Sequence, residues 1–190
     1  MPIIDKSNIL DRLKSMDKVI VELGCGKRKR NPNWIGIDTL DFEGVDIVGD
    51  VFAVLEEFPD HSIDCVHSFH FFEHVADLKK LLDELARVMK SNRQIEIVVP
   101  HFSNPHFYSD YTHKQFFGLY SFSYLAEDNL LRRRVPQYIG RTSFELLKVD
   151  LIFKSSPPFY GRHAFKKAIG FFFNMNTYMK ELYEETFCYL

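Results

Sequence analysis

A run of hydrophobic residues that ends in an acid and a glycine turn constrains this chain most. The run Val19-Ile20-Val21 is followed by Glu22-Leu23-Gly24-Cys25-Gly26. Three β-branched residues in succession predict a buried strand, and glycines let the backbone turn sharply and approach a ligand because they carry no Cβ. In a doubly wound α/β sheet, the nucleotide crevice opens at the carboxyl end of the first strand. The stretch therefore predicts a nucleoside site.

Further strands and helices follow in alternation. Strands are predicted over residues 34–38, 45–51, 63–69, 94–100 and 144–153. A short helix is predicted over 8–16 with Ser7 as its N-cap. A second helix is predicted over 73–90, because apolar residues recur there every three or four positions. This alternation indicates a mostly parallel, doubly wound sheet with right-handed crossovers.

The first crossover is unusually short. Only the seven residues Lys27 to Asn33 separate Gly26 from the second predicted strand. Parallel crossovers usually need about a dozen residues or more. We therefore expect at most one helical turn between the first two strands.

The chain changes character after His101. The periodicity fails there and aromatic residues crowd together, which predicts an aromatic-rich substrate or lid region. Ser121 is expected to cap a helix that runs to Glu127, and one or two helices are expected between Ala164 and Leu190. We expect a single domain over 1–190, with a cofactor-binding core at 1–100 and substrate-side and C-terminal elements at 101–190. The apolar segment from Phe171 onward is a candidate homodimer face.

Composition excludes several classes of partner. The net charge of −2 gives no global attraction to nucleic acid or to an anionic membrane. The sequence has no run of about 18 apolar residues, so no membrane span is expected. The N-terminus has neither signal-peptide nor transit-peptide character. The three cysteines, Cys25, Cys65 and Cys188, lie far apart without a CxxC pair, which fits a reducing cytoplasm.

Acidic residues mark the ends of the first three strands. They are Glu22, Asp38 and Asp50, while Lys29 stands where a dinucleotide fingerprint would have its third glycine. At this point the chain resembles the class I S-adenosylmethionine-dependent methyltransferases, and more closely their small type 11-like group, which is associated with surface-polysaccharide and other small-molecule biosynthesis. The matching segments are 22–26, 34–38, 46–50, 69–74, 85–90 and 99–114.

The resemblance implies a Rossmann-like fold, S-adenosylmethionine as cofactor, and roles for individual residues. Gly24, Cys25 and Gly26 would leave backbone room for the methionine part, and Glu22 would support that loop. Asp38 would accept both ribose hydroxyls. Asp50 would accept from the adenine amino group, Val51 would pack on the ring, and His67 and Ser68 would lie near the sulfonium. The seventh, antiparallel strand of these proteins has no evident counterpart after Phe153; truncation of the chain or an unrecognised form in its last residues would explain that.

Histidines supply the candidate bases. Methyl transfer from a sulfonium needs mainly positioning and exclusion of water, with a base only where the acceptor must lose a proton. We expect His70, His101 and His113 to face the acceptor, although each could instead be structural. His101, His106, Asp110 and His113 are metal-type ligands, but no HxxxH stands on a recognisable helix, and we expect no metal.

The sequence as a whole predicts a methyltransferase acting on oxygen or nitrogen of a small-molecule or saccharide-type acceptor. Two alternatives stay open. One is an RNA or protein methyltransferase that uses the basic runs 27–30 and 132–134, and the other is a catalytically inactive cofactor-binding or assembly module on the same fold. Charge runs are more often solvated turns, so we expect no nucleic-acid partner.

Overall fold

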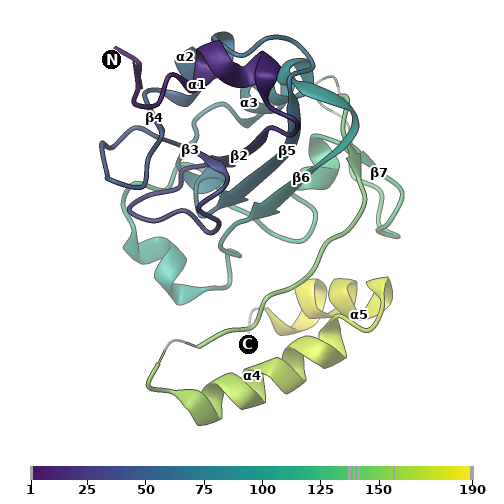
Figure 1. The fold of residues 1–190 in the computed structure, drawn as a ribbon. Helices are drawn as coiled ribbons and strands as arrows, with labels where there is room; N and C mark the ends of the chain where they lie inside the picture. The colour runs from purple at the N-terminus through teal and green to yellow at the C-terminus, as the bar shows by residue number, and fades with distance from the viewer. Residues whose placement is uncertain (1, 137, 139, 141, 156, 189–190) are drawn as a thin grey trace. The chain divides into compact units, whose positions relative to one another are not determined.

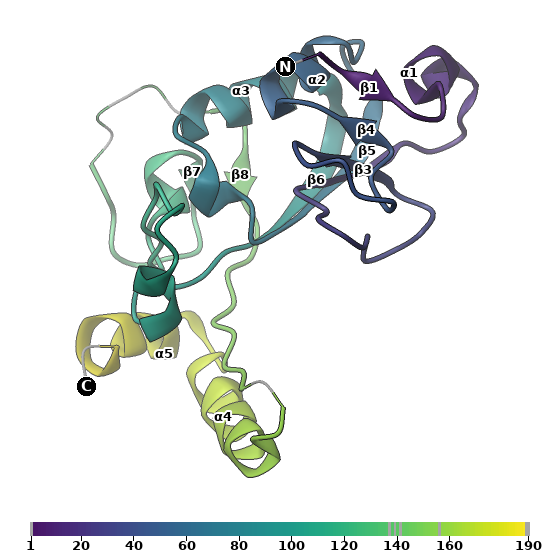
Figure 2. The same cartoon turned by 90° about the vertical axis from the view of Figure 1, so that its left-hand side faces the viewer.

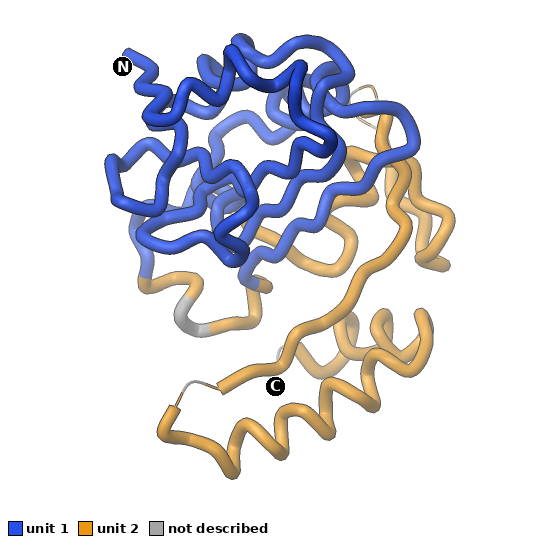
Figure 3. Tube along the Cα trace, in the orientation of Figure 1, with its two compact units in different colours: residues 1–100, 110–115 blue, residues 101–109, 116–190 orange. Residues whose placement is uncertain are grey.

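A computed structural model describes residues 2–136, 138, 140, 142–155 and 157–188. Contacts divide the chain into two compact units (Figure 3). Unit 1 comprises residues 1–100 and 110–115, and unit 2 comprises residues 101–109 and 116–190. The short segment 110–115 belongs to unit 1, although residues on both sides of it belong to unit 2.

A six-stranded sheet is the centre of unit 1 (Figure 1). Its order is β1-β4-β3-β2-β5-β6. The strands are β1 (Ile4–Asp5), β2 (Ile20–Leu23), β3 (Ile35–Asp38), β4 (Ile47–Val48), β5 (Ile63–Phe69) and β6 (Met89–Val98). β1 pairs with β4 antiparallel, and every other pair is parallel. The predicted mixed α/β, mostly parallel fold class is confirmed.

Short helices accompany the sheet: α1 (Ile9–Arg12), η1 (Leu13–Ser15), α2 (Val51–Glu56), η2 (Phe72–His74) and α3 (Leu78–Val88). The predicted cap at Ser7 is wrong. Asp5 takes that role, because its carboxylate accepts the N–H groups of Ile9 at 2.9 Å and Leu10 at 2.8 Å. The predicted helix over 73–90 is divided into η2 and α3, since the Asp77 side chain accepts from Lys80 N at 2.9 Å and begins a new helix.

The short first crossover is confirmed. Residues 24–34, all of which are described, form turns and bends without a helix between β2 and β3. The glycine turn after β2 is therefore joined to β3 by a loop without a helix. None of the helices in the described part of the chain has the length and apolar character needed to span a bilayer.

Unit 2 has its own secondary structure (Figure 2). It holds η3 (Pro105–Ser109), η4 (Phe122–Tyr124), β7 (Glu127–Asp128), β8 (Glu145–Leu146), α4 (Tyr160–Phe173), α5 (Thr177–Leu182) and a π-helix, η5 (Tyr183–Phe187). One or two helices were expected between Ala164 and Leu190, and α4 and α5 are present there; residues 189 and 190 lie outside the described part. The predicted helix from Ser121 to Glu127 is wrong: it is one 3-10 turn followed by β7.

The predicted sixth strand over 144–153 is also wrong. Only β8 forms, and it pairs with β7 in a separate two-stranded sheet. The alternation of Val149, Leu151 and Phe153 has another cause, because these residues pack around Phe173 of α4 in the core of unit 2. Among the described residues, β5 is the one strand paired with β6, so no seventh strand extends that edge.

A buried carboxylate joins β5 to its neighbours at the base of the sheet. Asp64 is 6% exposed and accepts from Val19 N at 3.0 Å and from Lys90 Nζ at 2.7 Å. Arg93 lies 3.4 Å away. Burial acts to raise the pKa of Asp64, but the hydrogen bonds from Lys90 and Val19 outweigh it and hold that pKa below its ordinary value.

Replacing Asp64 by Asn should lower the free energy of unfolding by about 1.5–3 kcal/mol at pH 7, because hydrogen bonds to a charged group are lost. The folded-state pKa lies below the unfolded value of about 3.9, so this contribution is complete above that pH and is lost as the pH falls through the folded pKa. Urea unfolding of both proteins between pH 7 and 3 measures it. The exposed pair of Asp60 with Arg87 is the control, and Asp60→Asn should cost less than about 1 kcal/mol. Equal losses for the two variants would contradict the role of Asp64.

Candidate functional site

The glycine turn after β2 is fastened to the end of β3. Gly24 N–H and Cys25 N–H both donate to Ile37 O, at 2.9 and 3.4 Å. Gly26 N–H donates to Asp38 Oδ2 at 2.8 Å, while Leu40 N–H donates to Asp38 Oδ1 at 2.9 Å. The Asp38 carboxylate thus shapes the turn, and each of its oxygens keeps a further lone pair.

The two glycines serve different purposes. Both have left-handed backbones, with φ +66° at Gly24 and +60° at Gly26. A Cβ on Gly24 would lie 2.6 Å from Phe71 Cβ, so this glycine makes room for the Phe71 side chain. A Cβ on Gly26 would meet nothing within 4 Å. Of the two glycines, only Gly26 therefore leaves an open approach to the backbone.

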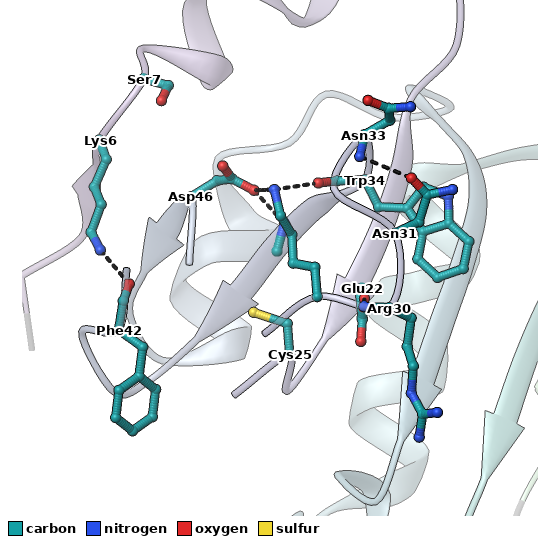
Figure 4. Close-up of polar contacts among 12 residues, drawn as sticks. Lys6, Ser7, Glu22, Cys25, Arg30, Asn31, Asn33, Trp34, Phe42 and Asp46 are labelled. Atoms are coloured by element: carbon teal, nitrogen blue, oxygen red, sulfur yellow. Dashed lines mark hydrogen bonds and ion pairs between the residues drawn. The ribbon is translucent and has the colours of Figure 1, made fainter. Parts of the chain in front are cut away.

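A network of charged groups supports the loop that follows (Figure 4). Glu22 is 3% exposed, and its Oε2 accepts from Arg30 N at 2.8 Å. Burial raises the pKa of Glu22, and the Arg30 N–H opposes that rise. Beside it, Asp46 accepts from Lys29 Nζ at 2.6 Å and from Gly36 N at 2.7 Å. The loop is therefore held by two carboxylates in place of a helix.

Sequence reasoning missed these contacts of the basic run. The sequence predicted that residues 27–30 form a solvated turn, with contact to RNA or protein as the alternative. In the structure Lys29 binds Asp46, and the Arg30 guanidinium lies 4.5 Å from the Phe69 ring centre. The sequence feature that could have indicated these contacts is Gly36, a glycine within the predicted strand 34–38. A Cβ on Gly36 would lie 2.7 Å from Cys25 Sγ and 2.8 Å from Lys29 Cδ. The absence of a side chain at Gly36 therefore lets both side chains pack against β3 at this position.

Cys25 is a core residue. It is 6% exposed and packs with Val45, Val48 and Phe42. Burial first, and then the Asp38 carboxylate, raise the pKa of its thiol to about 12. The Cys25 thiol is thus protonated at neutral pH and does not supply a nucleophile.

The predicted adenine-side residues begin α2. Asp50 is exposed, and its Oδ1 accepts from Phe52 N at 3.0 Å and Ala53 N at 3.3 Å, so it caps the helix. Val51 is 7% exposed and packs in the core. Both follow β4, whose Val48 is paired with Asp38, so Asp50 and Asp38 belong to neighbouring strand ends.

His67 and Ser68, at the end of β5, point to opposite faces of the sheet. The His67 ring stacks on Trp34, with centroids 3.9 Å apart, and its Nδ1 lies 2.8 Å from Glu96 Oε2. Its Nε2 lies 3.4 Å from Cys65 Sγ, so both ring nitrogens have partners. Ser68 is fully buried beside Leu23, and its Oγ has no hydrogen-bond partner among the described residues.

The three predicted bases fall in different places. His70 directly follows β5, is exposed, and has its Nδ1 3.4 Å from Glu73 Oε1. His113 belongs to segment 110–115 of unit 1, and its ring centroid lies 5.0 Å from that of His74. His101 belongs to unit 2, where Ser103 Oγ and Glu184 Oε2 each lie 2.8 Å from its ring nitrogens.

Comparison with known proteins identifies the family. The sequence profile described as "Methyltransferase domain" matches residues 6–147, more than half of the chain. The chain belongs to the methyltransferase domain family. This membership, together with the sheet, confirms the predicted class I methyltransferase.

One solved structure supports the fold of the methyltransferase, and a second aligns less well. A SAM-dependent methyltransferase from Archaeoglobus fulgidus aligns with a TM-score of 0.50 at 19% identity, covering 85% of each chain. The YcgJ protein from Bacillus subtilis aligns with a TM-score of 0.36 at 19% identity, covering 59% of this chain and 63% of that one. A search of curated protein sequences gave no match.

The two glycines of the methyltransferase provide a matched pair of substitutions. Gly24→Ala and Gly26→Ala each place Ala in a left-handed conformation, at a cost of about 1–2 kcal/mol. Only Gly24→Ala also meets Phe71, so it should lower the free energy of unfolding by a further ~1–3 kcal/mol. Urea unfolding measures both. The additional substitution Phe71→Gly removes Phe71 Cβ, the nearest atom, and should therefore remove most of that excess. Equal costs for the two alanines would show that Phe71 does not pack on Gly24.

Proposed function

We propose that this methyltransferase binds S-adenosylmethionine over the Gly24–Gly26 turn and transfers its methyl group to oxygen or nitrogen of a small-molecule or saccharide-type acceptor. The observation that carries the proposal is the pairing of Gly26 with Asp38. An open backbone position lies next to a half-buried carboxylate at the same end of the parallel sheet. Ligands of open α/β sheets bind at that end.

The residues at this edge fit the cofactor. Asp38 uses one lone pair on each oxygen for the turn and keeps others for two ribose hydroxyls. Asp50 uses Oδ1 for α2, which leaves Oδ2 for an amino group. Glu22 acts indirectly, by holding the loop through Arg30. Phe71 fills the space above Gly24, so close approach of the methionine part is proposed at Gly26.

When bound, S-adenosylmethionine supplies an electrophilic methyl group on a sulfonium that is its own leaving group, so the protein mainly positions the acceptor and excludes water. Of the predicted bases, we assign proton removal to His70. It follows the strand end directly, and Glu73 orients its ring from 3.4 Å. The ring nitrogens of His101 are already occupied by Ser103 and Glu184.

A small acceptor is favoured over RNA by the contacts of the arginine run. Arg132 lies over the Tyr178 ring at 5.6 Å and Arg133 over the Tyr120 ring at 5.1 Å, while Arg134 donates to Asp128 O. These guanidinium groups bind their own unit, and the net charge is −2. A salt-dependent affinity for RNA, measured by fluorescence anisotropy, would favour the RNA alternative instead.

The proposed partner beyond the acceptor is a second copy of the chain. On α4, Phe165, Ala168 and Phe172 are spaced along one helix face and are exposed, Phe165 at 69% and Phe172 at 52%. Sedimentation analysis should show a dimer for the natural chain and a monomer for Phe165→Ser/Phe172→Ser. A natural chain that sediments as a monomer at micromolar concentration would refute this contact.

The donor site is tested by calorimetric titration of S-adenosylmethionine and S-adenosylhomocysteine in a chelating buffer. Asp38→Asn should weaken both by about 5- to 150-fold, because a charged hydrogen-bond acceptor worth ~1–3 kcal/mol is lost. Asp41→Asn, on the same loop but paired with Lys6, should bind as the natural chain does. His70→Asn should also retain donor affinity while losing turnover. Unchanged affinity in Asp38→Asn would refute the assignment.

A further inference from the structure

Three side chains with metal-binding chemistry converge in unit 1. Glu73, His74 and His113 each offer one donor atom, and these atoms all lie within 4.8 Å of one another. Glu73 and His74 belong to η2, directly after β5, and His113 comes from segment 110–115. The cluster therefore combines two parts of the chain that are distant in sequence.

Backbone hydrogen bonds hold the two parts together. Lys114 N–H and Gln115 N–H donate to Glu73 O, at 2.7 and 3.2 Å. The Gln115 side chain donates to Ala76 O at 2.8 Å. These contacts hold His113 beside η2 through the backbone, while its side-chain Nε2 lies 3.6 Å from Asp110 Oδ2. The placement of His113 is thus built into the fold of unit 1.

The Glu73 carboxylate is the unusual member. Its side chain is 1% exposed, and within the described residues its Oε2 has no hydrogen-bond partner. The Nδ1 atom of His70 lies 3.4 Å from the other oxygen, Oε1. A buried carboxylate oxygen without a partner is costly, and bound cations are a common way of stabilising one.

The contacts of His74 fix which of its nitrogens can bind a ligand. Thr112 Oγ1 donates its proton to Asp110 Oδ1 at 2.6 Å, because a carboxylate can only accept. Thr112 Oγ1 must then accept from His74 Nδ1, which lies 3.0 Å away. The lone pair of neutral His74 is therefore on Nε2. Metal-binding histidines commonly donate their other N–H to such an outer group.

We propose that Glu73, His74 and His113 form a binding site for a divalent transition metal ion of the Zn²⁺ type. Two imidazoles and one carboxylate suit zinc, iron or manganese better than magnesium or calcium. Donors on one such ion, bound at ~2.0–2.2 Å, lie about 3–4 Å apart, so small side-chain rotations would close the site. The proposal replaces the expectation of no metal; of the four residues considered there, it uses only His113.

The place of the cluster indicates a role that rests on the function proposed above. Phe71, two residues before Glu73, packs on Gly24 of the turn assigned to the donor. Three protein ligands leave coordination positions open, and an ion there lowers the pKa of a bound hydroxyl. The acceptor class this favours is an alcohol or vicinal diol, whose oxygen can bind the ion.

The test is a calorimetric titration of chelator-treated, full-length protein with Zn²⁺ in the absence of any methyl donor. One ion should bind per chain, and Glu73→Gln, His74→Ala and His113→Ala should each weaken binding by at least about tenfold. Glu57→Gln and His163→Ala, which change an exposed glutamate and a histidine of unit 2, should bind Zn²⁺ like the natural chain. Unweakened binding in all three site variants, or no binding by the natural chain, would overturn the proposal.

Thermal unfolding separates metal binding from a structural role. Zn²⁺ at 100 times its Kd should raise the Tm of the natural chain by about 5–10 °C, and this rise should vanish in Glu73→Gln. Without metal, Glu73→Gln should unfold no lower than the natural chain, because a neutral amide replaces the buried carboxylate. An equal Zn²⁺-dependent rise in both proteins would overturn the site. Because this series contains no donor and the donor titration contains no metal, failure of one proposal is distinguishable from failure of the other.

Discussion

The attachment of the glycine turn to the end of β3 is the interaction on which the rest of this site depends. Ile37 O receives the N–H groups of Gly24 and Cys25, and the Asp38 carboxylate receives that of Gly26. In a typical doubly wound sheet, a crossover helix positions this turn. Here residues 24–34 contain no helix, so the hydrogen bonds to β3 do that work.

Without a crossover helix, the loop needs internal support, and buried charges supply it. Glu22 receives Arg30 N–H beneath the turn, and Asp46 joins Lys29 to Gly36 on the other side. Because these carboxylates bind Lys29 and the Arg30 N–H, the basic residues are held against the protein and do not form a solvated turn. The space for that arrangement comes from Gly36, which has no Cβ to obstruct Cys25 and Lys29.

A second set of backbone hydrogen bonds holds segment 110–115 against η2, which follows β5. Segment 110–115 returns to unit 1 and donates two backbone N–H groups to Glu73 O. This contact places His113 beside η2, although the two are about 40 residues apart in the sequence. The candidate donor site and the histidine cluster are thus both held by backbone hydrogen bonds, the first from the glycine turn to β3 and the second from segment 110–115 to η2.

Local pattern predicted the parallel strands and the brevity of the first crossover, because β-branched runs, glycine turns and strand-end acids act over a few neighbouring residues. The start of β6 is an exception, since Met89 and Lys90 were predicted as helix. The family followed from a resemblance that these motifs carry. Only the tertiary structure decided which of those residues meet. The alternation of residues 144–153, read as a sheet strand, packs on Phe173 instead, since period-2 burial does not say what covers the apolar face. The meeting of His113 with Glu73 depends on backbone hydrogen bonds between distant segments, and such contacts leave no local pattern in the sequence.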